Sequence, residues 1–445
     1  MKFFFPDSQD FVDPTFDFMT ERRRADRNRS RDDRYAHEVL KRPPFDGLLV
    51  SKAIVDGVDA SGKSAKYSLA QRHRLLRNGV RDYFRLDNHE GSRSLLTMGD
   101  CGAFSYVREK KPPFTVDEVI DFYEQCGFDL GVSVDHVILH FDETLDETFP
   151  GMDVVARECM QRQEITLDLA QEFKRRHEAR KSRFEPVGVA QGWSPKSYAA
   201  AVGKLQRMGY KRIALGGMVP LKTLDILSVL DRVARVRKPG VQLHLLGVTR
   251  TEQVEAFDRY GVTSFDTTSP FLRAFKDAKQ NYYTANGAYT ALRIPQVQGN
   301  ARVEKLIRSG AIDQLNARRL EQACLMRLRA YDAGKETLER VLDPLLEYEK
   351  LVSVTSVRSD RRDAYVRTLS ERPWAKCPCE VCRTIGVDVI IFRGSERNKR
   401  RGFHNLYVLY ERLHHELANM ARSSKRRLSL GVVAAGAATW EPEAN

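Results

Sequence analysis

The feature that most constrains the fold is a regular alternation of short apolar runs with helical segments through the middle of the chain. Runs of β-branched or aliphatic residues separated by helices indicate strands that pair in parallel. About eight such units over about 230 residues favour a closed (β/α)8 barrel, with an open sheet as the alternative. The predicted strands are Leu48–Ile54, Leu95–Met98, Leu130–Val134, Val187–Ala190, Ile213–Leu215, Leu243–Leu246 and Thr263–Phe265, with Tyr83-Phe84 as a candidate eighth.

Two of the intervening helices carry clear start signals. Thr115 and Glu118 have the spacing of a capping box, in which each side chain satisfies an otherwise unpaired backbone amide. Ser194 and Pro195 predict the start of a second helix, because serine caps a helix N-terminus and the fixed φ angle of proline suits the first turn. Gly209 predicts the end of this helix, because glycine readily adopts the left-handed conformation found there. Both helices follow predicted strands, as barrel units require.

The composition is that of a globular protein. Hydrophobic residues make up 42% of the 445 residues and charged residues 30%, and no apolar run reaches the roughly 20 residues that span a bilayer. The first residues, MKFFFPDSQDF, lack the apolar core and small-residue cleavage site of a secretory signal. We therefore expect a cytoplasmic protein with no membrane partner.

The chain is basic, with 73 Lys and Arg against 60 Asp and Glu and a formal net charge of +13. The positive electrostatic field of such a chain attracts polyanions. Basic residues crowd an N-terminal stretch from Arg22 to Arg34 and recur at Lys425-Arg426-Arg427. A third run predicts nucleic-acid-binding residues, with a solvated surface as the alternative: Arg397, Lys399, Arg400 and Arg401.

Three of the seven cysteines, Cys377, Cys379 and Cys382, fall within six positions, and His404 follows them. Closely spaced thiols indicate a metal site. Three thiolates and one imidazole complete a tetrahedral Zn²⁺ site that leaves no position for water, which predicts a structural zinc. We expect Cys126, Cys159 and Cys324 to be ordinary buried thiols.

These patterns predict five regions. Pro43-Pro44 interrupts regular structure, so we place the start of the folded body just after it. Residues 301–372 are highly charged, with helical periodicity and no strand pattern. The predicted regions are a charged N-terminal extension (1–44), a (β/α)8 barrel catalytic domain (45–300), a helical insertion (301–372), a zinc-binding subdomain with a C-terminal helix (373–421) and a basic flexible tail (422–445).

Polar residues follow five of the predicted strands. Active sites of (β/α)8 barrels lie at the C-terminal strand ends, so these residues should meet at one rim. A single aspartate there is more often a cap or turn former, but five converging strands favour a site. Carboxylates with an amide and a glycine pair can bind a planar base and attack a glycosidic carbon. The residues are Asp100, Asp135, Gln191, Gly216 with Gly217, and Asp266.

From about residue 45 to 410, the sequence resembles the guanine transglycosylase family, which exchanges guanine in nucleic acid for a 7-deazaguanine. Five segments match family motifs in order, and the cysteine cluster with His404-Asn405-Leu406 matches the family zinc motif. The five segments are Asp100-Cys101-Gly102-Ala103-Phe104, Asp129 to Asp135, Ala190-Gln191-Gly192, Leu215-Gly216-Gly217-Met218 and Phe265-Asp266.

The resemblance implies a role for each matching residue. Asp266 is the implied nucleophile and Asp100 the general acid/base. The base-binding residues are implied to be Asp135, Gln191, Gly216, Gly217 and Met218.

Departures from the family pattern lie around the site, at Cys101, Ala103 and Ser105 and in the stretch from Thr268 to Arg273. They bear on polynucleotide recognition more than on base exchange. The pattern is closer to the bacterial and phage branch that inserts a 7-deazaguanine such as preQ0 into DNA. We therefore expect a DNA-guanine transglycosylase, with companion DNA-modification proteins as further candidate partners. The alternatives are the same reaction on tRNA and a non-catalytic nucleic-acid-binding subunit.

Overall fold

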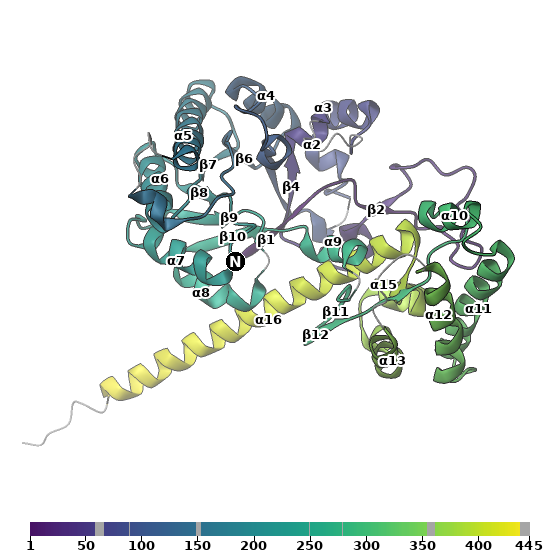
Figure 1. Cartoon of the computed structure of the whole chain (residues 1–445). Helices are drawn as coiled ribbons and strands as arrows, with labels where there is room; N and C mark the ends of the chain where they lie inside the picture. The colour runs from purple at the N-terminus through teal and green to yellow at the C-terminus, as the bar shows by residue number, and fades with distance from the viewer. Residues whose placement is uncertain are drawn as a thin grey trace, which may run out of the picture.

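The computed structural model describes residues 1–57, 66–88, 90–147, 153–248, 250–277, 279–353 and 361–436, with the backbone alone for residues 251 and 423–436. Eight parallel strands close into a barrel (Figure 1). This confirms the predicted (β/α)8 architecture. In order around the barrel the strands are β1 (Lys2–Pro6), β10 (Val262–Asp266), β9 (Gln242–Leu245), β8 (Arg212–Leu215), β7 (Glu185–Ala190), β6 (Leu130–Val132), β5 (Leu96–Asp100) and β4 (Gly47–Ser51).

The eighth strand is β1, at the very start of the chain. It pairs in parallel with β10 on one side and with β4 on the other, and Phe3, Phe4 and Phe5 are buried. The prediction that residues 1–44 lie outside the folded body is therefore wrong. Tyr83-Phe84 is not a strand, because Tyr83 ends helix α3 and Phe84 caps it. The N-terminal strand escaped the sequence pattern because no helix of barrel length connects it to β4.

Helices cover the outside of the barrel. The predicted capping box of Thr115 and Glu118 is present at α4, and Ser194 caps α6 with Pro195 in its first turn. Gly209 follows α6 with φ of +91°. The helices are α1 (Ala36–Val39), α2 (Lys52–Asp56), α3 (Leu69–Tyr83), α4 (Val116–Cys126), α5 (Val154–Arg180), α6 (Pro195–Arg207), α7 (Thr223–Ala234), α8 (Val254–Arg259) and α9 (Ser269–Lys276).

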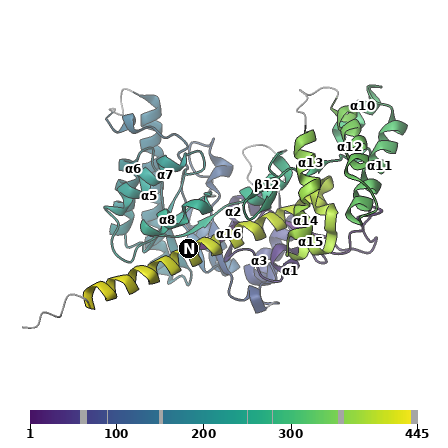
Figure 2. The ribbon, with the colours of Figure 1, turned by 90° about the horizontal axis from the view of Figure 1, so that it is seen from below.

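A second group of helices lies beside the barrel (Figures 1 and 2). The final helix, α16 (Gly394–Gly436), links the two parts by packing along α9, α8 and the small strand β11. The other helices are α10 (Ala301–Arg308), α11 (Gln314–Asp332), α12 (Leu338–Val352), α13 (Arg362–Glu371), α14 (Pro373–Lys376) and α15 (Glu380–Ile385). Three small strand pairs complete the fold: β2 (Phe11–Val12) with β3 (Arg34–Tyr35), β11 (Tyr282–Thr284) with β12 (Gly287–Tyr289), and β13 (Leu292–Arg293) with β14 (Ile391–Phe392).

The C-terminal region differs in part from the prediction of a flexible tail after residue 421. The backbone is helical as far as Gly436. The side chains of Lys425, Arg426 and Arg427 and all of residues 437–445 lie outside the described part of the chain. Within that part, no helix combines the length and the apolar character needed to cross a membrane.

Candidate active site and metal centre

The polar residues predicted at the strand ends share one rim of the barrel. Asp100 is the last residue of β5 and Asp266 the last residue of β10. Gln191 directly follows β7, and Gly216 directly follows β8. All eight strands run in the same direction, so these positions lie at the C-terminal face, where barrels carry their active sites.

Asp135 is the centre of a buried hydrogen-bond network. Its two carboxyl oxygens accept hydrogen bonds from the Cys101 thiol at 3.0 Å and from the Gln191 amide nitrogen at 2.7 Å. The Tyr106 hydroxyl donates to Cys101 Sγ at 3.0 Å. Burial raises the pKa of both Asp135 and the Cys101 thiol, which favours a protonated thiol that can donate. The network fixes the Asp135 carboxyl and the Gln191 amide side by side.

The glycine pair after β8 leaves room for this network. A Cβ atom on Gly216 would lie 2.1 Å from Nε2 of Gln191, and one on Gly217 would lie 2.3 Å from the Ile138 carbonyl oxygen. Gly217 also has φ of +71°, which side-chain-bearing residues rarely adopt. Met218, the next residue, is fully buried. Glycine is thus required here for both space and conformation, and the backbone comes close to the Gln191 amide group.

Asp100 is half-buried at the same rim. Burial and the negative charges of Asp135 and Asp266 raise its pKa to about 8, while the backbone amides of Gly102 and Cys101 partly oppose this shift. A carboxyl group with this pKa is mostly protonated at neutral pH. Asp100 can therefore donate a proton to a leaving group and later take one back.

Asp266 is held by two N–H donors on β9 and the loop after it. His244 Nε2 lies 3.2 Å from Asp266 Oδ1, and the Gly247 amide donates to the same oxygen at 3.0 Å. The other ring nitrogen, His244 Nδ1, lies 2.9 Å from the Ser264 hydroxyl. A tautomer protonated on Nε2 satisfies both contacts. Among the described residues these donors all reach Oδ1, which leaves Oδ2 for attack on a carbon centre.

The four predicted metal ligands come together beside the barrel. Their ligand atoms lie within 4.8 Å of one another, and Nδ1 of His404 is 3.5 Å from Sγ of Cys377, 3.5 Å from Sγ of Cys379 and 3.4 Å from Sγ of Cys382. Nitrogen and sulfur ligands on a tetrahedral ion with bonds of roughly 2.0 to 2.3 Å would be about 3.6 Å apart. The donor set and its spacing therefore fit a metal ion.

The surroundings of His404 also suit a ligand. Its Nε2 contacts the Tyr283 carbonyl oxygen at 2.8 Å, which leaves Nδ1 facing the thiols. The Tyr282 ring stacks on the imidazole with a centroid distance of 4.0 Å, and its hydroxyl lies 3.2 Å from Cys382 Sγ. Hydrogen bonding of the second imidazole nitrogen is typical of metal-bound histidines.

The predicted nucleic-acid-binding run is turned into the protein. Arg397, Arg400 and Arg401 are 2%, 6% and 0% exposed. Arg397 pairs with Asp388 and Glu21, Arg400 with Glu396, and Arg401 donates to the Val389, Ile391 and Ala274 carbonyls. Lys399 Nζ donates to the Phe11 carbonyl oxygen at 2.8 Å. The structure therefore contradicts the expectation that these four side chains contact phosphates, because each of them is bound by partners inside the fold.

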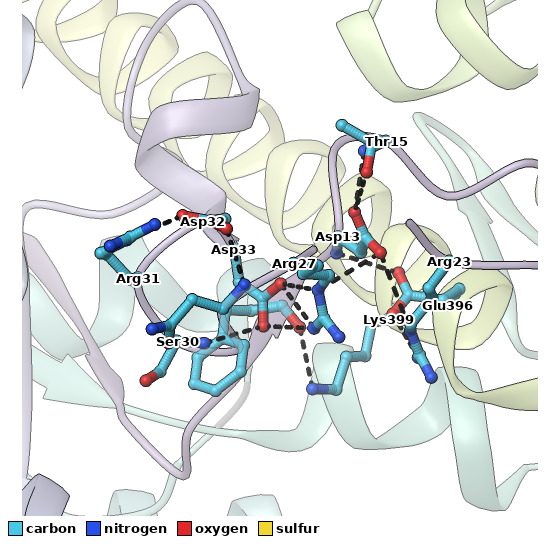
Figure 3. A network of polar contacts seen from close by, with 12 residues as sticks. Asp13, Thr15, Arg23, Arg27, Ser30, Arg31, Asp32, Asp33, Glu396 and Lys399 are labelled. Atoms are coloured by element: carbon cyan, nitrogen blue, oxygen red, sulfur yellow. Dashed lines mark hydrogen bonds and ion pairs between the residues drawn. The ribbon is translucent and has the colours of Figure 1, made fainter. Parts of the chain in front are cut away.

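Part of the N-terminal arginine run is paired with the same region (Figure 3). Arg23 donates to Glu396 at 2.7 Å, and Arg27 pairs with both Asp13 and Asp33. The sequence could not reveal the contact between Arg23 and Glu396, because these residues are more than 350 positions apart. Part of the basic N-terminal run is therefore engaged in ion pairs within the fold.

Two functional neighbours were not anticipated as site residues. His244 is fully buried and lies within a predicted strand, where its ionisable side chain among Leu243, Leu245 and Leu246 is the available sequence signal. Cys101 stands out in the sequence only as a departure from the family motif, and its contact with Asp135 depends on the register of β5 and β6. The backbone amide that donates to Asp266 belongs to Gly247, in the loop after β9.

Comparison with known proteins agrees with this geometry. No family model matches the sequence. A DNA-guanine transglycosylase from Salmonella montevideo is 51% identical over 419 residues, which cover 94% of this chain and 98% of that protein. Similarity of this extent covers nearly the whole length of both proteins. The chain is a transglycosylase and belongs to the DNA-guanine transglycosylase family.

Proposed function

We propose that this enzyme exchanges guanine in DNA for a 7-deazaguanine base such as preQ0, through a covalent intermediate on Asp266. The observation that carries the proposal is the pair of rim carboxyls in different environments. Asp100 has a pKa of about 8, whereas Asp266 is oriented by His244 and Gly247 with one oxygen left over. The related Salmonella protein, which is named for DNA and guanine, supports the substrate.

In the first step, Asp266 Oδ2 attacks C1′ of the deoxyguanosine. The bond from C1′ to the base nitrogen breaks, an ester bond forms to Asp266, and the Asp100 proton passes to the departing guanine. A protonated acid beside a carboxylate nucleophile is the arrangement used in retaining glycoside chemistry. Asp100 is then left as a carboxylate.

In the second step, Asp100 takes the proton from the ring nitrogen of the incoming 7-deazaguanine. That nitrogen attacks C1′ and displaces Asp266, so the sugar regains its original configuration after two inversions. Asp100 is protonated again and ready for another cycle. Asp135, Gln191, Gly216, Gly217 and Met218 line the edge that recognises the base, with the Gly217 amide and the Met218 carbonyl as backbone contacts. A stacked base cannot reach this rim, so the target nucleotide is flipped or single-stranded.

The Cys377, Cys379, Cys382 and His404 cluster holds a structural zinc ion in this proposal. Three thiolates and an imidazole leave no coordination site for substrate, so zinc supplies stability and takes no part in base exchange. The cysteines come from the segment around α15 and the histidine from α16, so the ion would join the C-terminal helix to the segment around α15.

The substrate is tested by incubating the enzyme with labelled preQ0 and either DNA or tRNA, followed by mass spectrometry of the released nucleosides. We expect a deazapurine deoxynucleoside from DNA and no labelled ribonucleoside. Label confined to tRNA would contradict the DNA assignment. Absence of label from both polymers, with a folded enzyme, would contradict base exchange altogether.

The nucleophile is tested by trapping enzyme with DNA, denaturing the mixture and looking for a DNA-shifted protein band. Asp266→Asn should remove the adduct, because an amide is a very poor nucleophile. Asp100→Asn should slow turnover and still allow some adduct, since attack on C1′ does not strictly require the Asp100 proton. An adduct that survives in Asp266→Asn and disappears in Asp100→Asn would reverse the two roles.

A further inference from the structure

An open pocket of about 900 Å³ lies at the junction of the N-terminal segment and the first turn of α3. Its walls come from residues 9–11 and 28–30 on one side and from residues 66–74 on the other. Gln71 Nε2 donates to Gln9 Oε1 at 2.6 Å, and the Tyr67 hydroxyl donates to Asp7 at 2.6 Å. These hydrogen bonds hold the two walls of the pocket in fixed positions relative to each other.

Three cationic side chains line this pocket: Arg29, Lys66 and Arg74. Arg29 and Lys66 are exposed, and Arg74 is half-buried. Arg29 lies over the Phe11 ring and Arg74 over the Tyr83 ring, at 5.9 and 4.7 Å from the centroids. Among the described residues, no carboxylate forms an ion pair with any of the three, in contrast to Arg23 and Arg27 nearby. Their charge is therefore available to an external anion.

The groups beneath the pocket do little to cancel this charge. Burial raises the pKa of Asp7, and burial with the charge of Asp7 raises that of Asp10 to about 7. Asp10 therefore carries only part of a negative charge near neutral pH. Lys399 adds a cation from below, since its Nζ donates to the Phe11 carbonyl and lies 4.9 Å from the Phe11 ring centroid.

The pocket lies next to the end of β1 at the C-terminal rim of the barrel. Asp7 directly follows β1, and its amide donates to the Leu49 carbonyl of β4, so both strands lead to the pocket. β1 and β4 lie between β10, which carries Asp266, and β5, which carries Asp100. The base-reading residues follow β6, β7 and β8 on the far side. A sugar held at Asp266 with its base pointing toward β6–β8 directs its phosphates over β1 and β4.

We propose that Arg29, Lys66 and Arg74 bind backbone phosphates of the DNA strand next to the nucleotide in the active site. This inference rests on the proposed function, in which DNA is the substrate. Exposed Leu69, at 68% accessibility, adds an apolar surface at the pocket for a neighbouring sugar or base. The site gives affinity for DNA without sequence specificity, because phosphates are common to all nucleotides.

The test is the triple variant Arg29→Gln/Lys66→Gln/Arg74→Gln. For a guanine-containing single-stranded oligonucleotide, we expect the KM to rise at least tenfold, with kcat and the KM for the free base unchanged. In fluorescence anisotropy, the slope of log affinity against log salt should become shallower by about 2, because each contact to single-stranded nucleic acid contributes about 0.7. A neutral methylphosphonate linkage next to the target nucleotide should weaken wild-type binding and have little further effect on the variant.

The matched control is Lys204→Gln/Arg207→Gln/Lys211→Gln. These three exposed residues lie at the end of α6 and the start of β8, at the opposite end of the barrel, and the net charge changes equally. Equal effects of the two triple variants, or an unchanged KM and slope in the first, would overturn the proposal. If the triple variant fails to fold, Arg29→Gln/Lys66→Gln removes only exposed side chains and should give about two thirds of the slope change. A wild-type enzyme that binds DNA without exchanging its bases would contradict the proposed function, while the anisotropy comparison would still decide the pocket.

Discussion

His244 Nε2 lies 3.2 Å from Oδ1 of Asp266, and both residues are buried at the C-terminal rim of the barrel. Ser264 holds the other imidazole nitrogen, and the Phe4 ring packs edge-on at a centroid distance of 5.8 Å. The imidazole is thus fixed from two sides. This arrangement makes His244 a positioning residue for the proposed nucleophile.

Replacing His244 with Phe should lower kcat about tenfold or more with little change in the KM for DNA. The ring volume is kept, but Asp266 loses a hydrogen bond, and a bond to a charged group contributes about 1.5 to 3 kcal/mol. Single-turnover rates of adduct formation measure the effect. Ser264→Ala is the control, since it leaves the bond from Nε2 to Asp266 in place and should cost less. A variant with normal adduct formation would show that His244 has only a packing role.

The rate of exchange should fall as the pH rises through about 8, because the proposed proton donor Asp100 has a pKa of about 8. The pH profile of kcat for the wild type measures this limb, and Asp100→Asn should abolish it along with most of the activity. A wild-type limb that instead persists unchanged in Asp100→Asn would assign the titration to another group.

The raised pKa of Asp100 should also make the stability of the protein depend on pH. Asp100 binds its proton more tightly in the folded state than in the unfolded state, where the pKa is near 3.8. Its contribution to the free energy of unfolding is therefore largest below pH 4 and declines as the pH rises toward 8. Asp100→Asn should raise the Tm relative to wild type, with a difference that grows from pH 4 to 8. Thermal unfolding across this range checks the trend, and a difference independent of pH would contradict it.

Cys379→Ser should release the proposed zinc and lower the Tm. Cys379 is buried, and its loss leaves three ligands for an ion whose binding energy contributes to folding. Metal analysis should give about one zinc per wild-type chain and far less in the variant. Cys126→Ser alters a buried thiol away from the cluster and should keep the metal. If wild-type protein purified without chelators is folded but contains no zinc, the assignment of a zinc site is wrong.

Arg397→Gln should destabilise the protein without changing the salt dependence of DNA binding. The guanidinium is 2% exposed and bonds to Asp388, Glu21 and the Phe18 carbonyl, and breaking such buried pairs costs about 3 to 5 kcal/mol. Denaturant unfolding and anisotropy titrations measure the two properties. Arg24→Gln, in an exposed pair with Asp26, should leave the Tm nearly unchanged. A flatter salt slope in Arg397→Gln, with normal stability, would restore the phosphate-binding interpretation.

The sequence by itself determined the features that depend on local order along the chain. The alternation of apolar runs and helices predicted the barrel, and the capping box of Thr115 and Glu118 predicted a helix start that the structure contains. The spacing of Cys377, Cys379 and Cys382 similarly predicted a cluster, because ligands a few residues apart are held together by the chain itself.

Only the tertiary structure decided which distant residues meet. Lys2–Pro6 completes the barrel between β10 and β4, although a lone strand without a flanking barrel helix gives no periodic pattern. Arg397 and Arg29 both belong to basic runs, yet the first is buried against acidic partners and the second lines an open pocket. Composition records the charge of an arginine, but its availability depends on the carboxylates and solvent that surround it after folding.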